Sequence, residues 1–367
     1  FLDLNDAGRV RFLCLMADNY SVDEVHLTAV IESWLSADSD QRVMLEAQLR
    51  SALEPPRMKL LTQFNELPQG VKFLVDMLSA LLRLRRELPT LLPLEVDLMR
   101  LLRACFDVGL LQLEEINWSS SAELLEKLIA YEAVHAIQSW TDLKNRLDSD
   151  RRCFAFFHPN MPDEPLIFVE VALVKGMANN VQALLDESAP LEDIRLADTA
   201  IFYSISNAQK GLSGISFGNF LIKSVVKKLQ QEFPQLKQFA TLSPIPGFCR
   251  WLDSMDAVKA SDLLGEDSMS SSPEQLQKLA AHYLVEQKQK RNVKHARDPV
   301  AHFHLSNGAK LERLNWMADT SDNGVKQSAG MMVNYLYELP HIERRSQSYS
   351  ADGKVAVSTS VEKQLNL

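Results

Sequence analysis

The sequence predicts an α+β protein of two domains, an all-helical domain followed by an α/β domain built on a mixed sheet. Three observations predict this division. The 367 residues exceed what one hydrophobic core usually supports. Apolar residues recur at helical spacing up to about residue 130. From about residue 150, short apolar runs alternate with polar turns and an amphipathic stretch, which indicates strands alternating with helices.

The first predicted domain, residues 1–130, is expected to be helical throughout. Residues 70–88 place seven apolar side chains on one helical face, namely Val71, Phe73, Leu74, Met77, Leu78, Leu81 and Leu82. Residues 92–113 show the same spacing, and short breaks that contain Pro or Asp separate the runs. This pattern is typical of a helical bundle, which more often serves as a scaffold or an oligomer interface than as an active site.

The second predicted domain covers residues 131–367 and is expected to hold the sheet. Two apolar runs flank the turn sequence "HPNMPDEP", and two more strands and one amphipathic helix follow. The strands are predicted at 151–157, 166–174, 199–206 and 238–242, and the helix at 218–233. This alternation favours a mixed sheet covered by helices.

The bulk composition excludes several classes of protein. A formal net charge of −9 argues against a general nucleic-acid binder, which needs a basic surface. No apolar run approaches the roughly 20 residues of a membrane span. Four scattered cysteines without a CxxC pair indicate a reducing compartment, for which we expect the cytoplasm. Because the chain begins at Phe1 and not at methionine, a targeting segment ahead of it stays open.

A glycine-rich turn follows the strand predicted at 199–206 and leads into the predicted helix. Gly211, Gly214 and Gly218 would let the backbone approach a ligand, and the start of a helix favours a phosphate or pyrophosphate. The turn is neither GxGxxG nor a Walker loop. It resembles the pyrophosphate loop of the GCN5-related acyltransferase (GNAT) superfamily, with Gln209 ahead of the glycines. An ordinary tight turn between strand and helix explains the glycines equally well.

Two further motifs could supply reactive side chains. In "FATLSPIPGF", two prolines lock the chain after Ser243, so the loop is either a structural corner or a means of holding a hydroxyl still. In "VAHFHLSNG", His302 and His304 would point the same way on a strand, as a metal pair does. No cysteine or nearby carboxylate completes such a site, so we predict no metal. A single histidine here could act as a general acid, since its unperturbed pKa is about 6.5.

Taken together, the motifs resemble those of the malonyl-CoA decarboxylase family. The resemblance rests on "FFHPNMPDEPLIFVEVALV", "TAIFYSISNAQKGLSGISFGNFLIK", "LSPIPGF", "VAHFHLSNGAKLERLNWMAD" and "MVNYLY", which follow in this order and cover most of residues 150–340. It implies a helical domain used in oligomerisation, as a homodimer or homotetramer, and a GNAT-like catalytic domain. It also implies a carboxy-lyase of fatty acid metabolism that converts malonyl-CoA to acetyl-CoA and CO2 without a metal, biotin or another cofactor.

The resemblance also implies roles for individual residues. The family's catalytic serine corresponds to Ser243 and its catalytic histidine to His304, while Ser204 and Tyr337 match polar residues of its active site. The loop that binds malonyl-CoA corresponds to Ser213, Gly214, Ile215, Ser216, Phe217, Gly218 and Asn219. Two positions depart from some relatives, which carry glutamate in place of Ser216 and asparagine in place of His302.

We therefore expect an enolate-like intermediate that His304 protonates, with Ser243 bound to the malonyl carboxylate or relaying the proton. Tyr337 and Ser204 would orient these two residues. Two alternatives remain from the sequence. The first is an acyl-CoA-dependent N-acyltransferase on the same fold, and the second is a non-catalytic protein that binds acyl-CoA or serves as a scaffold.

Overall fold

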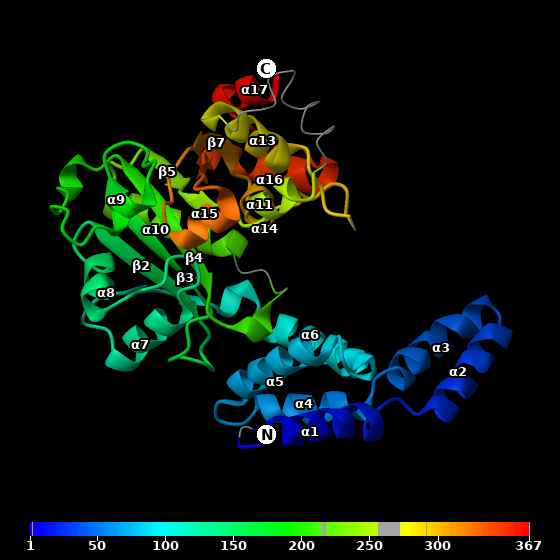
Figure 1. Cartoon of the computed structure of the whole chain (residues 1–367). Coiled ribbons are helices and arrows are strands. Elements are labelled where there is room, and N and C mark those ends of the chain that lie inside the picture. Colours follow the sequence, from blue (N-terminus) through cyan, green and yellow to red (C-terminus); the bar gives the residue numbers. More distant parts are fainter. Residues whose placement is uncertain (2, 214, 216–217, 256–271, 291, 367) are drawn as a thin grey trace. The chain divides into compact units, whose positions relative to one another are not determined.

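The computed structural model describes residues 1, 3–213, 215, 218–255, 272–290 and 292–366 (Figure 1). The chain divides into two compact units. The first unit comprises Phe1–Gln112, Phe157–Leu166 and Ala208–Ser216, and the second comprises Leu113–Phe156, Ile167–Asn207 and Phe217–Leu367. Two short segments from the middle of the chain thus belong to the N-terminal unit.

Helices make up the first unit, as the leucine spacing predicts. They are α1 (Asp6–Asn19), α2 (Glu24–Ser36), α3 (Ser39–Ala52), α4 (Pro56–Asn65), α5 (Gly70–Leu84) and α6 (Leu92–Cys105), with short 3-10 helices η1 (Pro89–Leu91), η2 (Val108–Leu110) and η4 (Lys210–Leu212). The apolar face of α5 supplies much of the core, and Leu74, Met77, Leu78 and Leu81 are fully buried on it. Burial of one helical stripe against its neighbours is the main stabilising interaction of such a bundle.

The glycine-rich turn after β4 (Thr199–Asn207) folds onto α5 in this unit. A Cβ atom on Gly211 would lie 1.9 Å from the carbonyl oxygen of Val75, so η4 and α5 approach backbone to backbone. The side-chain amide of Gln209, which is buried, donates to Glu164 Oε2 (3.1 Å) and to the carbonyl oxygen of Pro165 (3.0 Å). Gln209 therefore anchors the turn to the protein itself.

An eight-stranded sheet forms the centre of the second unit within the described residues, in the order β1-β2-β3-β4-β5-β8-β6, with β7 on β8. The strands are β1 (Gln112–Ile116), β2 (Arg151–Phe157), β3 (Ile167–Val174), β4, β5 (Gln238–Thr241), β6 (Ser243–Pro244), β7 (Lys310–Asn315) and β8 (Met332–Leu336). Neighbours whose register is defined run antiparallel except β4 and β5, which are parallel. Strand β5 pairs with β4 only from Thr199 to Phe202, so β4 continues to Asn207 without it.

Helices surround this sheet in the second unit (Figure 1). They are α7 (Ala122–Tyr131), α8 (Trp140–Arg146), α9 (Val181–Leu185), α10 (Gly218–Glu232), α11 (Phe248–Leu252), α13 (Pro273–Val285), α14 (Pro299–Ser306), α15 (Asp322–Ser328), α16 (Ile342–Asp352) and α17 (Thr359–Asn366), with η3 (Ile194–Leu196) and η5 (Leu339–His341). Helix α10 is the predicted amphipathic helix, and Leu221, Ile222, Val225, Val226 and Leu229 are its buried face. None of the helices in the described part of the chain is long and apolar enough to cross a membrane.

The predicted fold class is confirmed, with two local corrections. A strand, β1, occupies Gln112–Ile116, a segment predicted to be helical. The side chains of β1 alternate between more and less exposed, as in an edge strand. The leucines on either side of this segment fit a helical spacing, so the short alternating pattern was not recognised in the sequence. The second correction concerns His302 and His304: a metal pair would need both on one face of a strand, and the segment that carries them is the helix α14.

Candidate active site

Ser243 lies at the start of β6, where the chain leaves the central part of the sheet. It pairs with Val333 of β8, and it is 6% exposed. The loop that follows is held by hydrogen bonds as well as by its prolines, because the amide of Ile245 donates to Ser328 Oγ (3.0 Å) and that of Gly247 donates to Asp298 Oδ2 (3.3 Å). The hydroxyl of Ser243 is therefore presented from a fixed backbone.

Helix α14 presents His304 to this serine. Asp298 caps the helix by accepting from the amides of Val300 and Ala301, and Pro299 occupies the first turn, where it needs no hydrogen-bond partner. Residues two apart on a helix point roughly 200° apart. His302 accordingly faces another side, where its Nδ1 lies 2.9 Å from Tyr349 Oη, and only His304 reaches Ser243.

Four side chains form one hydrogen-bonded chain at the site. His304 Nε2 lies 3.0 Å from Ser243 Oγ, and His304 Nδ1 lies 2.8 Å from Tyr337 Oη. Ser243 Oγ in turn donates to Thr241 Oγ1 (2.9 Å). All four residues are buried. The structure thus brings together three residues that the sequence singles out, Ser243, His304 and Tyr337.

The direction of these hydrogen bonds defines the tautomer of His304. Because the Ser243 hydroxyl donates its only proton to Thr241, its oxygen must accept from Nε2–H of His304. Nδ1 then carries no proton and accepts from the hydroxyl of Tyr337. The imidazole also stacks on the ring of Tyr335, with 4.6 Å between centroids and 25° between planes. The ring is held on two edges and one face.

Burial determines whether the hydrogen-bonded side chains His304 and Tyr337 are charged. Burial lowers the pKa of His304 from 6.5 to about 3, because the imidazolium would lose its hydration. Burial also raises the pKa of Tyr337 well above its usual value. Without a bound anion, the side chains of the site are therefore neutral near pH 7.

Acidification is expected to destabilise the fold through His304. In the unfolded chain this histidine titrates near pH 6.5, whereas burial lowers its pKa in the folded state to about 3. The unfolded state therefore binds the extra proton between these two values. The free energy of unfolding falls as the pH drops through that window, by up to about 1.4 kcal/mol per pH unit, and His304 adds no pH dependence above it.

Urea unfolding of the wild type and of His304→Gln, followed between about pH 5 and pH 8, measures this contribution. The wild type should lose stability more steeply than the variant below about pH 6. Equal slopes for the two proteins would show that the folded-state pKa of His304 is not depressed.

A cavity of about 300 Å³ opens beside Ser243 and His304. Its lining is mainly apolar and comes from the segment before α8, from β4, from β6 and from α14, namely Val134, Phe202, Tyr203, Ile205, Asn207, Ser243, Pro244, Pro299, Val300, Phe303 and His304. No lysine or arginine lines it among the described residues. Its size suits a small organic group, which would lie against the Ser243 hydroxyl and the His304 imidazole at the wall.

Ser204 lies apart from this chain of hydrogen bonds. Its hydroxyl donates to the carboxylate of Glu132 (2.8 Å to each oxygen), and Ser206 Oγ donates to the same carboxylate (3.0 Å). Glu132 Oε1 also accepts from the amides of Val134 and His135. The sequence analysis expects Ser204, together with Tyr337, to orient Ser243 and His304. In the structure its hydroxyl binds Glu132, which also holds the segment that brings Val134 to the cavity wall.

The predicted malonyl-CoA loop is described only in part. Ser213 is an exposed residue of the first unit, and the amide of Ile215 donates to the carbonyl oxygen of Leu212. Gly214, Ser216 and Phe217 lie outside the described residues. Gly218 and Asn219 form the first turn of α10, as a loop that leads into a helix requires.

Comparisons with known proteins define the family. A family model described as "Malonyl-CoA decarboxylase C-terminal domain" matches residues 109–367, and one described as "Malonyl-CoA decarboxylase N-terminal domain" matches residues 20–106. The chain belongs to the malonyl-CoA decarboxylase family. The mitochondrial malonyl-CoA decarboxylases of Anser anser anser and Mus musculus are 34% and 36% identical to it, over 96% of this chain and 79% and 81% of theirs.

Solved structures of the same family agree with this assignment. The malonyl-CoA decarboxylase of Rhodopseudomonas palustris is 40% identical, with a TM-score of 0.90 over 99% of this chain and 92% of that one. The enzyme of Agrobacterium vitis is 39% identical, with a TM-score of 0.88 over 100% and 93%. The family fold therefore extends over both units of the chain.

Three residues of the site were missed when the sequence was read alone. Thr241 stands two positions before Ser243, and strand alternation places both on one face, so a signal existed. Asp298 could have been found from the Asp-Pro pair, a common helix start. Tyr335 sits in the "NYLY" motif, but nothing in its spacing distinguishes a stacking tyrosine from a core residue. Among the residues that the structure describes, no group of three or more His, Cys, Asp or Glu side chains is placed to hold a metal ion.

Proposed function

We propose that this chain is a malonyl-CoA decarboxylase that converts malonyl-CoA to acetyl-CoA and CO2. The observation that carries the proposal is the buried chain from Tyr337 through His304 to Ser243, which opens on an apolar cavity of about 300 Å³. Membership of the malonyl-CoA decarboxylase family supports it.

The lining of the cavity favours loss of CO2. A malonyl carboxylate in it would lie among apolar side chains, with no described lysine or arginine in the lining to stabilise its charge. Breaking the bond to CO2 moves the electron pair onto the α-carbon and the thioester oxygen, where the charge is spread over a larger group. Because the thioester carbonyl itself accepts these electrons, we propose that the reaction needs no added cofactor.

Ser243 is the hydrogen-bond donor for the substrate. Its hydroxyl rotates from Thr241 to the malonyl carboxylate or to the enolate oxygen, while Nε2–H of His304 continues to hold its oxygen. A donor held in place before the reaction stabilises developing charge without reorganisation. No covalent acyl-serine is needed in this scheme.

His304 carries the proton that the reaction consumes. The malonyl carboxylate brings a negative charge next to a histidine whose pKa is otherwise lowered by burial to about 3, and an adjacent anion raises such a pKa. The imidazole takes up one proton as the substrate binds. This proton binds at Nδ1, beside Tyr337, so the proton that faces the substrate is the one on Nε2. When CO2 has left, Nε2–H passes its proton to the Ser243 hydroxyl, which gives its own proton to the α-carbon of the enolate, and the imidazole is left neutral with its proton on Nδ1, so charge and protons balance.

Proton uptake on binding tests this step. A stable analogue with a sulfonate in place of the malonyl carboxylate is titrated into the protein by calorimetry in buffers of different ionisation enthalpy. The wild type should take up about one proton per site near pH 7, and His304→Asn none. Binding of the analogue without proton uptake by the wild type would contradict the assignment.

The reaction itself is tested with the purified protein and malonyl-CoA. Acetyl-CoA and CO2 should form in equal amounts, and in D2O the acetyl group should gain one deuterium, because the last proton comes from an exchangeable group. Transfer of an acyl group to an added amine, with no CO2 released in its absence, would favour the N-acyltransferase. Tight acyl-CoA binding without turnover would favour the binding protein.

We propose that the helical unit joins copies of this chain into a homo-oligomer, and that the region from residue 131 onward carries catalysis. The hairpin of α2 and α3 supports the first part, because Val25, Leu35, Val43 and Met44 on it are exposed, Met44 by 75%. Apolar side chains gathered on one hairpin favour coverage by a partner. A second copy is the occupant that the family resemblance implies.

Light scattering after size exclusion checks the assembly. Val43→Glu combined with Met44→Glu should reduce the mass to that of one chain, while the fold persists in circular dichroism. Leu196→Glu, a change at a similarly exposed apolar residue of the second unit, serves as the control and should leave the mass unchanged. An unaltered mass for the double variant would place the interface elsewhere.

We also propose a reducing compartment, the cytoplasm in the simplest case, because Cys14, Cys105, Cys153 and Cys249 are all free thiols. Fractionation of the source cells tests it, and recovery of the protein from an oxidising compartment would overturn it.

A further inference from the structure

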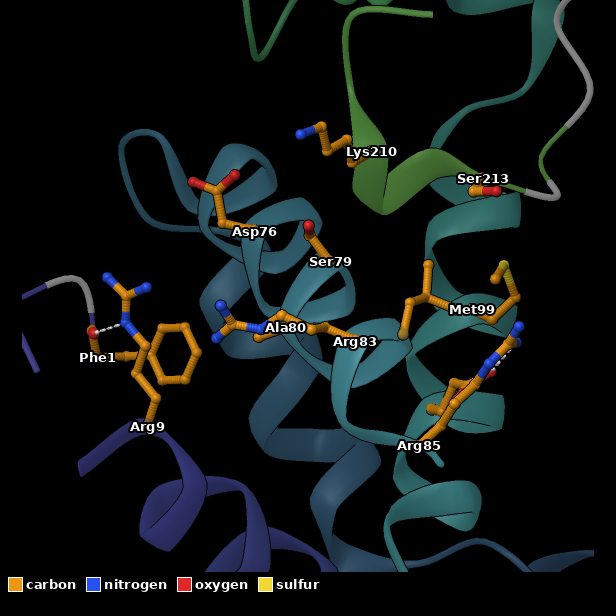
Figure 2. Close-up of a pocket in the computed structure, with 12 residues that line it drawn as sticks. Phe1, Arg9, Asp76, Ser79, Ala80, Arg83, Arg85, Met99, Lys210 and Ser213 are labelled. Atoms are coloured by element: carbon orange, nitrogen blue, oxygen red, sulfur yellow. Dashed lines mark hydrogen bonds and ion pairs between the residues drawn. The ribbon is translucent and has the colours of Figure 1, made fainter. Parts of the chain in front are cut away.

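Polar side chains are held differently in two cavities of the protein. The larger, of about 900 Å³ in the first unit, is lined by charged side chains such as Arg83, which forms an ion pair with Asp6 at 3.3 Å (Figure 2). Both side chains are more than half exposed, so water competes for this pair. The cavity beside Ser243 and His304 has buried polar side chains instead. There a single hydrogen-bonding group can fix the direction of a proton, because a lost partner is not replaced by water.

Thr241 is such a group, and strand β8 holds it in place. It is the last residue of β5 and is fully buried. Its Oγ1 accepts from the backbone amide of Tyr335 (3.2 Å) and from the hydroxyl of Ser243 (2.9 Å). Its carbonyl oxygen accepts from the side-chain amide of Asn334 (2.8 Å). Two incoming hydrogen bonds occupy both lone pairs of a hydroxyl oxygen, so Thr241 Oγ1 is a fixed acceptor for the proton of Ser243.

The opposite end of this hydrogen-bonded chain imposes the same direction. Tyr337 is buried, and its hydroxyl lies 2.8 Å from His304 Nδ1. A buried phenol proton needs an acceptor, and Nδ1 can accept only when it carries no proton. Burial keeps the imidazole neutral near pH 7, because it lowers the pKa of His304 to about 3. The single ring proton is then on Nε2 and points to Ser243 Oγ, which must direct its own proton elsewhere.

We propose that Thr241 is a positioning residue of the reaction, which keeps the hydroxyl proton of Ser243 away from His304. It acts through Ser243, because it is not among the described residues that line the cavity. With Thr241 as the acceptor, Ser243 can turn its proton to the substrate while Nε2–H continues to hold its oxygen. If Ser243 donated to Nε2 instead, the same turn would leave two atoms without a proton facing each other at 3.0 Å. The consequence for catalysis rests on the proposed function.

Nitrogen NMR measures the position of the ring proton directly. In protein that contains nitrogen-15-labelled histidine, the chemical shift distinguishes a bare ring nitrogen from a protonated one, and His304→Asn identifies the signals of His304. At about pH 8 the wild type should carry this proton on Nε2. Thr241→Val removes the acceptor and should move a large share of the proton to Nδ1. A wild-type proton on Nδ1, or an unchanged tautomer in Thr241→Val, would overturn the proposal.

Steady-state kinetics measure the consequence for the reaction. Thr241→Val should lower kcat for malonyl-CoA on the order of tenfold and leave KM within about threefold, because the lost hydrogen bond orients Ser243 and does not touch the substrate. Thr241→Ser keeps the hydroxyl and should restore kcat to within about threefold of the wild type. The proposal is wrong if folded Thr241→Val keeps the wild-type kcat, or if Thr241→Ser is as slow as Thr241→Val.

Thr199→Val is the matched control for these measurements. Thr199 is also a fully buried threonine of the sheet, at the start of β4. Its hydroxyl donates to Asp198 (2.8 Å) and not to a residue of the site. This variant should leave kcat and the tautomer of His304 unchanged. An equal loss of kcat in Thr199→Val would mean that a buried threonine acts through the stability of the sheet, which would contradict the proposal.

The NMR measurement separates this inference from the proposed function, since it requires no turnover. A protein that releases no CO2 but shows the expected tautomers would refute the decarboxylase and keep the role of Thr241 in placing the proton. A protein that releases CO2 with the proton of His304 on Nδ1 would do the reverse. Should Thr241→Val fail to fold, because the amide of Tyr335 loses its acceptor, the wild-type spectrum alone still supports or overturns the direction of the hydrogen bonds.

Discussion

Replacing His304 by asparagine is expected to lower kcat for malonyl-CoA by about a hundredfold to ten-thousandfold, the range for loss of a positioned general acid. The variant keeps a polar side chain but cannot carry the proton that the enolate needs. The amide is also too short to bridge Ser243 and Tyr337, which the imidazole joins at 3.0 Å and 2.8 Å. Initial rates of acetyl-CoA formation measure the effect.

The neighbouring histidine supplies the control for this experiment. His302 lies on the same helix but contacts Tyr349, so His302→Asn should retain kcat within about threefold. Both variants must keep the wild-type circular dichroism spectrum. Should a folded His304→Asn decarboxylate at the wild-type rate, the proton would have to come from another group, and the assignment of the acid would be wrong.

Gly211→Ala is expected to lower the free energy of unfolding by about 3 kcal/mol, at the upper end for overpacking. The added Cβ would lie 1.9 Å from the carbonyl oxygen of Val75 and 3.1 Å from the amide nitrogen of Ser79. Both atoms belong to the backbone of α5, so no side chain can rotate away. Either η4 must lift from the helix or α5 must bend.

Chemical denaturation of the wild type and the variant measures this difference. Gly109→Ala is the matched control, because its added Cβ would meet its nearest neighbour, Asp107 Oδ1, at 3.4 Å, an ordinary contact. That change should alter stability by no more than about 0.5 kcal/mol. A stable Gly211→Ala protein would mean that η4 does not pack on α5 as closely as described.

The buried strands of the sheet and the helix that packs on it were the easiest elements to predict. Their burial requires apolar side chains at regular spacing along the whole element, which is visible in the sequence. The strands at Arg151–Phe157 and Thr199–Asn207 and the helix at Gly218–Glu232 follow from apolar spacing alone. Strand β1 was missed, because a five-residue edge strand leaves too short a pattern among leucine-rich helices. The spacing of His302 and His304 was weighed as it would appear on a strand, although an Asp-Pro pair precedes the segment. That local capping signal outweighs a two-residue histidine spacing.

The site was predictable in its chemistry but not in its connections. The prolines after Ser243 left open a structural corner or a held hydroxyl, and the family resemblance indicated Ser243, His304 and Tyr337. No sequence pattern could show that the Ser204 hydroxyl turns toward Glu132, because the two residues are 72 positions apart. The tautomer of His304 likewise depends on the Ser243 hydroxyl donating to Thr241 and not to His304, which only the three-dimensional geometry shows.

Helix α14 carries both His304, the proposed acid, and much of the wall of the cavity beside it. Val300 and Phe303 line the cavity from the same short helix as His304, and Asp298 ties the start of that helix to the loop after Ser243. Substrate range can therefore be engineered separately from reactivity. Trimming Val300 to alanine should enlarge the room for a branched malonyl group, while the hydrogen bonds of Asp298 keep the start of the helix, and with it His304, in place beside Ser243.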